Sequence, residues 1–358
     1  MISWQTYYRP QKFSQLHLQQ VSQQMQTLAQ NGTLPQVLLF TGPKGTGKTS
    51  TARIIAAILN SKHNRKTIDY YYFQKQPTST DYTFLDPDLQ DPQIIQILNG
   101  NSYSVVEIDA ASHRGIDDVR QLQEQVYLPP SLSQVTVYIL DEVHMFTTEA
   151  FNALLKILEE PPAHAFFILA TTEFHKIPAT ITSRCHLVNF TKATHAEIIT
   201  ALQNIIKQEK LKAEDEALNS IAELADGSFR DAVKLLQTIH HQGDITNQKV
   251  NELLIGNQNQ QLHSLIQIIL TKDQIKLIEF FAQLRQNNFD EKFFIKNLFQ
   301  YLHQQLIANL KGEKNLTLTQ AQATFLLQKM LSYQFNSQIP FLNLELIILE
   351  IICKKKKK

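Results

Sequence analysis

An octapeptide near the N-terminus, G-P-K-G-T-G-K-T from Gly42 to Thr49, leaves few choices for the fold around it. It fits the phosphate-loop pattern G-x-x-x-x-G-K-[S/T], which needs a strand before it and a helix after it. The apolar run Val37–Thr41 comes directly before the octapeptide, and a helical pattern, Thr49–Leu59, comes directly after it. The local sequence therefore predicts a strand–loop–helix unit that binds the phosphates of a nucleotide.

The chemistry of this loop follows from its residue types. Its glycines let the backbone wrap around phosphates with the N–H groups pointing inward, and the helix N-terminus adds partial positive charge. We expect Lys48 to reach the β- and γ-phosphates and the Thr49 hydroxyl to bind Mg²⁺. The predicted nucleotide-binding residues here are Gly42, Pro43, Lys44, Gly45, Thr46, Gly47, Lys48, Thr49 and Ser50.

A second apolar run, Val135–Leu140, ends in two carboxylates, Asp141 and Glu142. Asp141 is expected to hold Mg²⁺ through water, so that Thr49 and Asp141 form the predicted magnesium site. Glu142 is expected to polarise the attacking water. An acidic strand end that faces solvent is the alternative for either carboxylate alone. Together with the phosphate loop, the pair predicts binding and hydrolysis of Mg-ATP.

Short apolar runs alternate with helical patterns through the first half of the chain. This alternation favours a parallel sheet with helices on both faces, and runs that are apolar throughout are typical of strands buried on both faces. The predicted fold class is therefore α/β with a parallel five-stranded sheet. The predicted strands are Val37–Thr41, Val105–Asp109, Val135–Leu140, Phe166–Thr171 and His186–Phe190.

After Phe190 only helical patterns follow. A capping box at Thr194–Glu197 predicts a helix that runs to about Lys210. The polar stretch Gly256–Gln261 is interpreted as a linker, and helical patterns continue from Leu262 to Cys353. The predicted domains are an α/β nucleotide-binding domain at 1–190, a small helical domain at 191–255, an all-α domain at 256–353 and a poly-lysine tail at 354–358.

Charge and cysteine content exclude several classes of protein. Without the terminal Lys354–Lys358, 29 basic residues face 33 acidic ones, which excludes a protein that holds nucleic acid through a global positive field. Two cysteines, Cys185 and Cys353, cannot make a disulfide framework, which favours a reducing compartment. The first ten residues lack the apolar core of a signal peptide, and no apolar run approaches about 18 residues. We therefore expect a soluble, cytoplasmic protein.

Further motifs resemble one known family, the AAA+ clamp-loader ATPases, and within it the gamma/tau subunits of bacterial DNA polymerase III. The similarity covers about residues 4–255 and implies the AAA+ P-loop fold with a helical lid after the α/β domain. For the rest of the chain, length and helical pattern fit a collar domain. The motifs are Leu140–Met145, Phe151–Lys156, Leu158–Pro162, Leu169–Thr172, Thr182–Cys185, Val106–Ser112 and Gly227–Ala232.

The resemblance implies roles for residues outside the phosphate loop. Thr172, or its neighbour Thr171, resembles sensor 1, and Arg230 resembles sensor 2, which would tie the lid to the γ-phosphate. Arg184 resembles the arginine that reaches the ATP of the next subunit. Tyr8, Arg9 and Pro10, after Tyr7, resemble a stretch near the adenine. The plainer alternatives are a threonine pair that ends a strand, surface arginines and simple aromatic packing.

The sequence departs from the family in three places. The usual zinc module needs four cysteines, and the segment Asn60–Ser104 has none, so no zinc is expected. The cluster Tyr70–Phe73 is expected to pack where the metal stands in relatives. Leu18-Gln19 replaces the usual Gly-Gln. The chain also stops where the collar is expected to end, which resembles the short, gamma-like form.

The resemblance implies an ATP-driven motor subunit of the replicative clamp loader within the DNA polymerase III holoenzyme, without a polymerase active site of its own. The implied partners are the delta and delta-prime subunits, further gamma/tau copies, the sliding clamp and primer–template DNA, in the nucleoid-associated cytoplasm and away from membranes. Ser112, Arg114 and Gly115 are candidates for DNA phosphates because they precede a predicted helix, Ile116–Val126.

Two alternatives stay open at this point. One is a non-hydrolysing scaffold like the delta-prime subunit, in which the phosphate loop is usually degenerate. The other is a different AAA+ DNA machine, such as a branch-migration helicase or a small subunit of replication factor C. The box D-E-V-H and the pair Thr171-Thr172 argue against the second. The apolar faces of the last helices fit either a surface for oligomerisation or an ordinary core.

Overall fold

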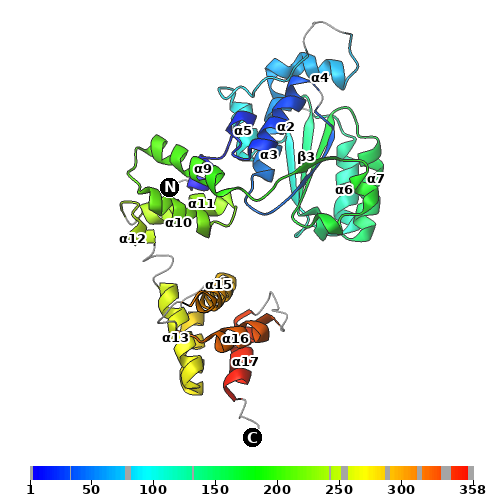
Figure 1. Ribbon diagram of the computed structural model, residues 1–358. Coiled ribbons are helices and arrows are strands. Elements are labelled where there is room, and N and C mark those ends of the chain that lie inside the picture. The colour runs from blue at the N-terminus through cyan, green and yellow to red at the C-terminus, as the bar shows by residue number, and fades with distance from the viewer. Residues whose placement is uncertain are drawn as a thin grey trace. The chain divides into compact units, whose positions relative to one another are not determined.

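A parallel sheet of five strands lies at the centre of the N-terminal part of the chain (Figure 1). Its spatial order is β2-β3-β4-β1-β5, so that the strand before the phosphate loop lies between β4 and β5. The strands are β1 Val37–Thr41, β2 Val105–Asp109, β3 Thr136–Asp141, β4 Ala165–Thr171 and β5 His186–Asn189. All five predicted strands are confirmed, and each end lies within one residue of its predicted position.

The computed structural model of the chain describes residues 3–32, 34–76, 82–130, 133–241, 243–250, 257–286, 291–312, 317–331 and 340–353. It separates into two compact units, Met1–Asn247 and Gln248–Lys358. The predicted domain limits at residues 190 and 255 stay predictions, and the predicted lysine tail, Lys354–Lys358, lies outside the described residues.

The helices of the first unit include those predicted at Thr49–Leu59, at Ile116–Val126 and from the capping box at Thr194–Glu197 to about Lys210. The helices of this unit are α1 Trp4–Tyr7, α2 Gln19–Gln30, α3 Lys48–Asn60, α4 Arg65–Tyr71, α5 Pro92–Asn99, α6 Ile116–Val126, α7 Thr148–Glu159, α8 Ala179–Thr182, α9 His195–Glu209, α10 Asp215–Leu224 and α11 Phe229–His240. The boundary between the two units falls within α12 Asn247–Val250, directly after its first residue. Short 3-10 turns are η1 Phe13–Gln15, η2 Lys62–Asn64, η3 Val143–Met145 and η4 Phe174–Lys176.

Capping explains where several helices begin. The Thr147 hydroxyl accepts a hydrogen bond from the Ala150 amide at 3.2 Å at the start of α7. The predicted capping box of α9 is confirmed, because Thr194 Oγ1 accepts from the Glu197 amide and Glu197 accepts from the Thr194 amide. Ser228 caps α11 through the Asp231 amide at 3.2 Å. These side chains satisfy amide groups that the first helical turn leaves unpaired.

The two faces of the sheet are covered by different helices. Successive residues of a strand point to opposite faces, and Leu39, Leu140 and Leu169 form one apolar layer with α6 and α7. The helix α3 contacts β3 and β4. Figure 1 shows α6 and α7 on one side of the sheet and α2, α3 and α5 on the other. The phosphate loop therefore leads from a fully buried strand into a helix packed on that sheet.

The cysteine-free segment between α3 and β2 is held by aromatic and amide contacts. Tyr70 stacks on Tyr82 with ring centroids 4.0 Å apart, and the Tyr72 hydroxyl donates to the Leu34 carbonyl. Asn64 is fully buried, donates to the Ile58 and Leu85 carbonyls at 2.9 Å each, and accepts from the Leu85 amide at 2.8 Å. The helices α4 and α5 in this segment were not predicted from the sequence.

The second unit is helical, as its pattern predicts. Its helices are α13 Asn257–Thr271, α14 Gln274–Gln286, α15 Glu291–Leu310, α16 Gln320–Leu331 and α17 Pro340–Cys353. Leu265, Phe281, Phe294 and Leu344 are fully buried in its apolar core.

The interpretation of Gly256–Gln261 as a linker was wrong, because α13 already begins at Asn257. Glutamine is a good helix former, and asparagine, which is unfavourable inside a helix, is tolerated where a helix begins, as at Asn257 here. A polar, amide-rich stretch therefore formed the first turn of a helix whose apolar face begins at Leu262.

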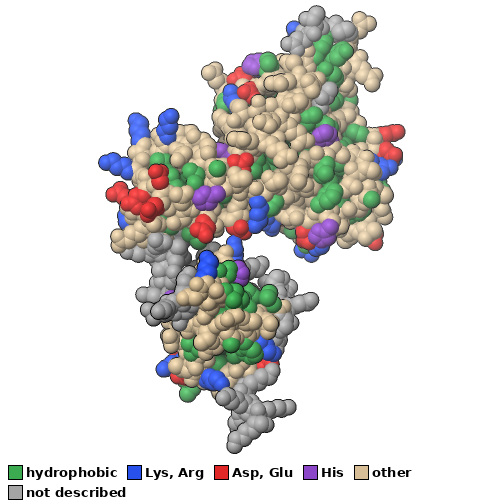
Figure 2. Space-filling model, in the orientation of Figure 1, with side chains coloured by type: hydrophobic (Ala, Val, Ile, Leu, Met, Phe, Trp, Pro, Cys, Tyr) green, Lys and Arg blue, Asp and Glu red, His purple; other side chains and the backbone are tan. Residues whose placement is uncertain are grey.

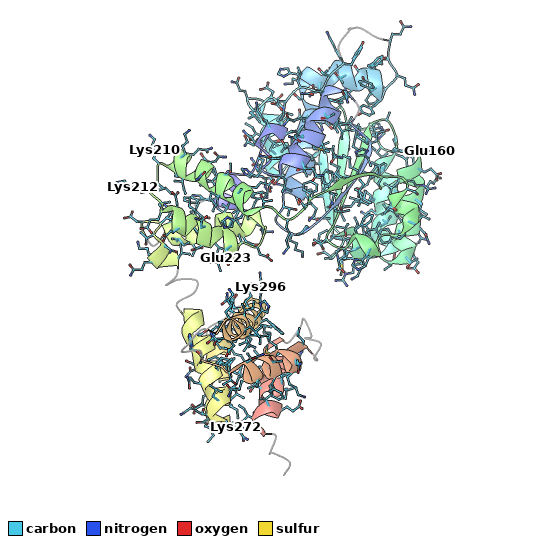
Figure 3. All side chains as sticks on the ribbon, in the orientation of Figure 1. Glu160, Lys210, Lys212, Glu223, Lys272 and Lys296 are labelled. Atoms are coloured by element: carbon cyan, nitrogen blue, oxygen red, sulfur yellow. The ribbon has the colours of Figure 1, made fainter. Side chains whose placement is uncertain are left out.

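The surface carries charges of both signs. On the face that Figure 2 shows, acidic and basic side chains lie interspersed. Figure 3 shows Lys210 and Lys212 extending outward from the helical part of the first unit, with Glu223 on the same part. Within the described residues, no helix has the length and apolar character needed to cross a membrane.

Candidate nucleotide-binding site

A cavity of about 530 Å³ opens at the C-terminal ends of β1, β2 and β3. Ligands of parallel α/β sheets bind at this edge, and sites for small molecules usually measure about 300–1,000 Å³. Its walls come from residues between Trp4 and Val21, from the phosphate loop and from the first turns of α11. The predicted site residues that line it are Tyr8, Arg9, Pro10, Lys44, Gly45, Thr46, Gly47, Lys48, Thr49, Ser50, Asp141, Glu142 and Arg230.

The phosphate loop has the backbone shape that its glycines predict. Gly47, the residue before α3, has a φ of 103°, a conformation that residues with a side chain rarely adopt. A Cβ atom at Gly47 would meet nothing within 4 Å, so the loop leaves open space directly before the helix N-terminus. This is where phosphate oxygens can approach backbone amides.

Lys48 is buried in the loop itself. Its Nζ donates to the Gly42 and Pro43 carbonyls at 2.7 Å each. Burial lowers the pKa of Lys48, while the carboxylates of Asp141 and Glu142 act in the opposite direction. Carbonyl groups of the phosphate loop therefore hold the Lys48 ammonium group at the cavity, where it is predicted to bind phosphates.

Thr49 and Asp141 come together from α3 and β3. The Thr49 Oγ1 atom lies 3.5 Å from Asp141 Oδ2. Burial raises the pKa of Asp141, and a hydrogen bond from the Glu142 amide partly offsets this. A hydroxyl and a carboxylate beside a phosphate-binding loop are the oxygen donors that Mg²⁺ takes, so the pair fits the predicted metal.

Glu142 follows β3 in a left-handed backbone conformation, with a φ of 49°. For a residue other than glycine this conformation is uncommon, and it recurs at functional sites as well as at helix ends such as Lys210. The carboxylate lies 3.2 Å from Lys44 Nζ and accepts a hydrogen bond from Thr172 at 3.0 Å. Burial acts to raise the pKa of Glu142, but the hydrogen bonds from Lys44 and Thr172 and the charges of Lys44 and His144 together outweigh it, so that the pKa lies below its usual value.

The two threonines at the end of β4 have different surroundings. Thr172 donates to Glu142, whereas the Thr171 hydroxyl is fully buried and lies 3.0 Å from His144 Nδ1. Neither is among the residues that line the cavity. The sequence left the choice between them open, and the structure brings Thr172 to the carboxylate at the site.

Arg230 reaches the cavity because α11 begins on the phosphate loop. The Gly45 carbonyl accepts from the amides of Phe229 at 3.0 Å and Arg230 at 3.4 Å. Gly45 has a φ of 77°, and a Cβ atom there would lie 2.1 Å from Ser228 Oγ. The absence of a side chain at Gly45 therefore lets the helix start directly against the loop.

The N-terminal segment forms the opposite wall and is fastened to the helices that follow β5. Trp4 stacks on His240 of α11 with ring centroids 5.1 Å apart, and the Tyr8 hydroxyl donates to Glu209 of α9. Burial lowers the pKa of Arg9, and the charge of Arg53 adds to this effect. A larger groove of about 1560 Å³ shares this wall and is lined mostly by polar side chains, many of them amides.

Arg184 lies outside this cavity. Its guanidinium donates to the Thr180 carbonyl at 2.8 Å and to Glu159 at 3.2 Å, close to the end of α7 that Glu160 marks in Figure 3. Its Nε atom is buried and has no hydrogen-bond partner among the described residues. The structure therefore does not bring Arg184 to the nucleotide site of its own chain.

Two charged or polar residues near the site, Asp109 and His144, were not predicted. Asp109 ends β2 as Asp141 ends β3, the two are register partners, and Asp109 lines the cavity. His144 lies between Glu142 at 3.5 Å and Glu173 at 3.3 Å. The matching strand ends were the available signal for Asp109, and the box D-E-V-H already contained His144.

The candidate DNA-binding residues before α6 have partners within the chain. The Gly115 amide donates to Asp118 at 3.2 Å, and Arg114 Nε donates to the Ala111 carbonyl at 2.8 Å. Asp117 and Asp118 also place negative charge in the first turn of α6. This helix start is therefore a less favourable phosphate site than its position in the sequence indicated.

Comparison with known proteins identifies the family. A family model described as "DNA polymerase III, delta subunit" matches residues 17–194, and one described as "DNA polymerase III clamp loader subunit, ATPase lid domain" matches residues 197–243. The DNA polymerase III subunit tau of Bacillus subtilis is 36% identical over 310 residues, which are 84% of this chain and 51% of that protein. The subunit gamma of Buchnera aphidicola from Baizongia pistaciae is 31% identical over 300 residues, 83% of this chain and 76% of that protein.

The chain spans about half the length of the tau and gamma/tau relatives from Bacillus subtilis and Mycoplasma genitalium. Among solved structures, the Holliday junction branch migration motor RuvB of Thermotoga maritima aligns with a TM-score of 0.48 at 17% identity, over 78% of this chain and 85% of that one. Family membership accordingly rests on the sequence relatives. On that basis, the chain belongs to the gamma/tau family of DNA polymerase III clamp-loader subunits and has their AAA+ nucleotide-binding fold.

Proposed function

We propose that this chain is an ATP-driven motor subunit of the replicative clamp loader. It would open the sliding clamp and load it on primer–template DNA, with delta, delta-prime and further gamma/tau copies as partners in the nucleoid-associated cytoplasm. The observation that supports this most strongly is the complete phosphate loop facing Asp141 and Glu142 across one cavity. Its relatives carry the names of DNA polymerase III subunits.

The proposed chemistry assigns one task to each group at the cavity. Lys48 would neutralise phosphate charge, and Thr49 and Asp141 would hold Mg²⁺, which supplies further positive charge beside the phosphates. Glu142 would accept a proton from the attacking water, since carboxylates at a suitable distance act as general bases. Thr172 would orient Glu142, to which it already donates a hydrogen bond.

Two arginines would contact nucleotides that are bound to different subunits. Arg230 would contact the γ-phosphate from the lid helix of the same chain, because its backbone already lies on the phosphate loop. Arg184 would act on the nucleotide of a neighbouring subunit, which agrees with its position outside its own cavity. A guanidinium supplied by the neighbour couples hydrolysis to assembly.

Two substitutions test the nucleotide site. Lys48→Ala should abolish tight ATP binding, because it removes the cation of the loop, and titration with a fluorescent ATP analogue measures this. Glu142→Gln should keep ATP binding and lose turnover, because only the activation of water is removed. Unchanged affinity in Lys48→Ala, or unchanged turnover in Glu142→Gln, would contradict the assignment.

A non-hydrolysing scaffold subunit is the second candidate. The match of residues 17–194 to a family model described as a delta subunit favours it. The same turnover assay separates the two functions. A scaffold would show no ATP hydrolysis with DNA and clamp present, whereas a motor subunit would hydrolyse ATP and lose this activity in Glu142→Gln.

A further inference from the structure

Lys44 and Glu142 form an ion pair across the mouth of the cavity. The Nζ atom of Lys44 lies 3.2 Å from Glu142 Oε1, while Thr172 donates to the other oxygen, Oε2. The Lys44 side chain is 81% exposed and that of Glu142 is 18% exposed. A flexible, exposed cation is therefore holding a largely buried carboxylate.

The other lysine of the loop does not perform this task. Lys48 Nζ is turned to the Gly42 and Pro43 carbonyls, and the remaining cationic neighbour of Glu142 is His144 at 3.5 Å, when protonated. Lys44 stands on the same loop whose backbone is shaped for phosphates, and both residues line the cavity. Phosphates that enter the cavity would compete with Glu142 for the Lys44 ammonium, because both are anionic oxygen ligands.

We propose that Lys44 changes its partner when nucleotide binds, from the Glu142 carboxylate in the empty site to a phosphate in the filled site. This inference rests on the proposed function and adds a regulatory step to it. In the empty site the cation holds Glu142 in place through its Oε1 atom. Arrival of ATP releases the carboxylate, so that the base becomes available only when its substrate is present.

The geometry agrees with this arrangement, since Lys44 and Thr172 hold the Glu142 carboxylate through its two different oxygens. Lys44 is in this sense a positioning residue, which acts on hydrolysis through Glu142. The effect of this exchange on ATP affinity can be separated from the ordinary attraction between Lys44 and phosphate, because the exchange also involves Glu142. It makes the effects of changing Lys44 and changing Glu142 on ATP affinity non-additive.

The test is a double-mutant cycle on ATP affinity, measured with the full chain and N-methylanthraniloyl-ATP. Glu142→Gln removes the repulsion between the Glu142 carboxylate and the phosphates whether or not Lys44 is present. In a chain that keeps Lys44, it also frees the Lys44 ammonium to bind a phosphate. The tightening caused by Glu142→Gln should therefore be about two- to five-fold larger in the wild-type background than in Lys44→Met, the range expected for an exposed ion pair. Lys44→Arg should restore the coupling because it keeps the charge.

A matched control pair is available in the same unit. Lys62 is also 81% exposed and lies 2.9 Å from Asp91, whose side chain is 11% exposed. The cycle of Lys62→Met with Asp91→Asn should show no coupling in ATP affinity, because neither residue lines the cavity. Coupling there would mean that general charge changes produce the signal, which would overturn the inference.

Equal tightening by Glu142→Gln in the presence and absence of Lys44 would also overturn the inference, and the proposed function would stand. If the wild-type chain fails to bind the analogue at all, the proposed function itself fails, and the exchange fails with it. The two failures are therefore distinguishable in one set of titrations.

Discussion

Replacing Asn64 by alanine should destabilise the first unit more than any surface change in the same segment. Asn64 is fully buried, and its side chain makes three hydrogen bonds that fasten the stretch around Leu85 to the end of α3. Two of these bonds go to the backbone of Leu85, and the third goes to the Ile58 carbonyl. This amide is therefore a buried polar link between the end of α3 and the stretch around Leu85.

The magnitude follows from the bonds that are lost. A hydrogen bond contributes about 1 kcal/mol net, so three of them amount to roughly 3 kcal/mol of unfolding free energy. The Ile58 carbonyl keeps a bond from the Ser61 amide at 3.2 Å, whereas the Leu85 amide loses its partner. For a unit of about this size each kcal/mol shifts the melting temperature by about 2–4 °C, which gives a fall of roughly 6–12 °C.

Differential scanning calorimetry of the full chain measures this fall. Asn99→Ala is the control, because it makes the same chemical change at an exposed position of α5 and should shift unfolding by less than about 0.5 kcal/mol. ATP affinity below the transition should stay near that of the wild type, since Asn64 is not among the residues that line the cavity. Equal melting temperatures for Asn64→Ala and Asn99→Ala would refute the proposed role of the amide.

Three further predictions concern the arginine, the metal and a thiol. Arg184→Ala should bind ATP and assemble but lose stimulated turnover by about 10³–10⁵-fold. Mixing it with Lys48→Ala should restore part of the activity, because the Lys48→Ala subunit still donates its arginine to a neighbour. A mixture that assembles yet stays inactive would contradict action between subunits. Elemental analysis should find well under one zinc per chain, and a chelator should leave the melting temperature unchanged, whereas zinc retained through dialysis would overturn the expectation from Asn60–Ser104. Burial raises the pKa of the Cys185 thiol to about 12, so native protein at pH 8 should alkylate there far more slowly than unfolded protein, as peptide mass mapping would show; equal rates would mean that the thiol is accessible.

The fold of the first unit was largely accessible from the sequence, because its three central strands, β1, β3 and β4, are buried on both faces, whereas β2 and β5 at the sheet edges are partly exposed. Each strand is a short apolar run between polar residues, so that pattern and position agree, as at Val37–Thr41. The order of the strands was not predicted, since it depends on contacts between distant segments. The helices α4 and α5 were missed because this short region offers no long apolar face, and α5 is defined by its Asp91 cap and its proline instead.

The residues of the site that belong to sequence motifs could be predicted from the sequence. The sequence identified the loop and both carboxylates, but it could not distinguish Thr171 from Thr172, because that depends on which hydroxyl faces Glu142. The roles of Asn64 and His144 could not be predicted from the sequence either. Both depend on partners that the fold brings near, and a single polar residue in a sequence does not indicate which partners it will contact.

The walls of the cavity are joined by contacts that lie outside it. Trp4 stacks on His240, and the Trp4 amide donates to Gln237 at 3.1 Å, so the N-terminal segment is fastened to α11. The start of α11 is in turn fastened to the phosphate loop through the Gly45 carbonyl. A change in how the loop is occupied would therefore be transmitted to α11 through its backbone and from there to the segment that carries Arg9. The same connection works in reverse, because coupling between sites is reciprocal, so a partner that shifts α11 would alter nucleotide affinity without touching the cavity.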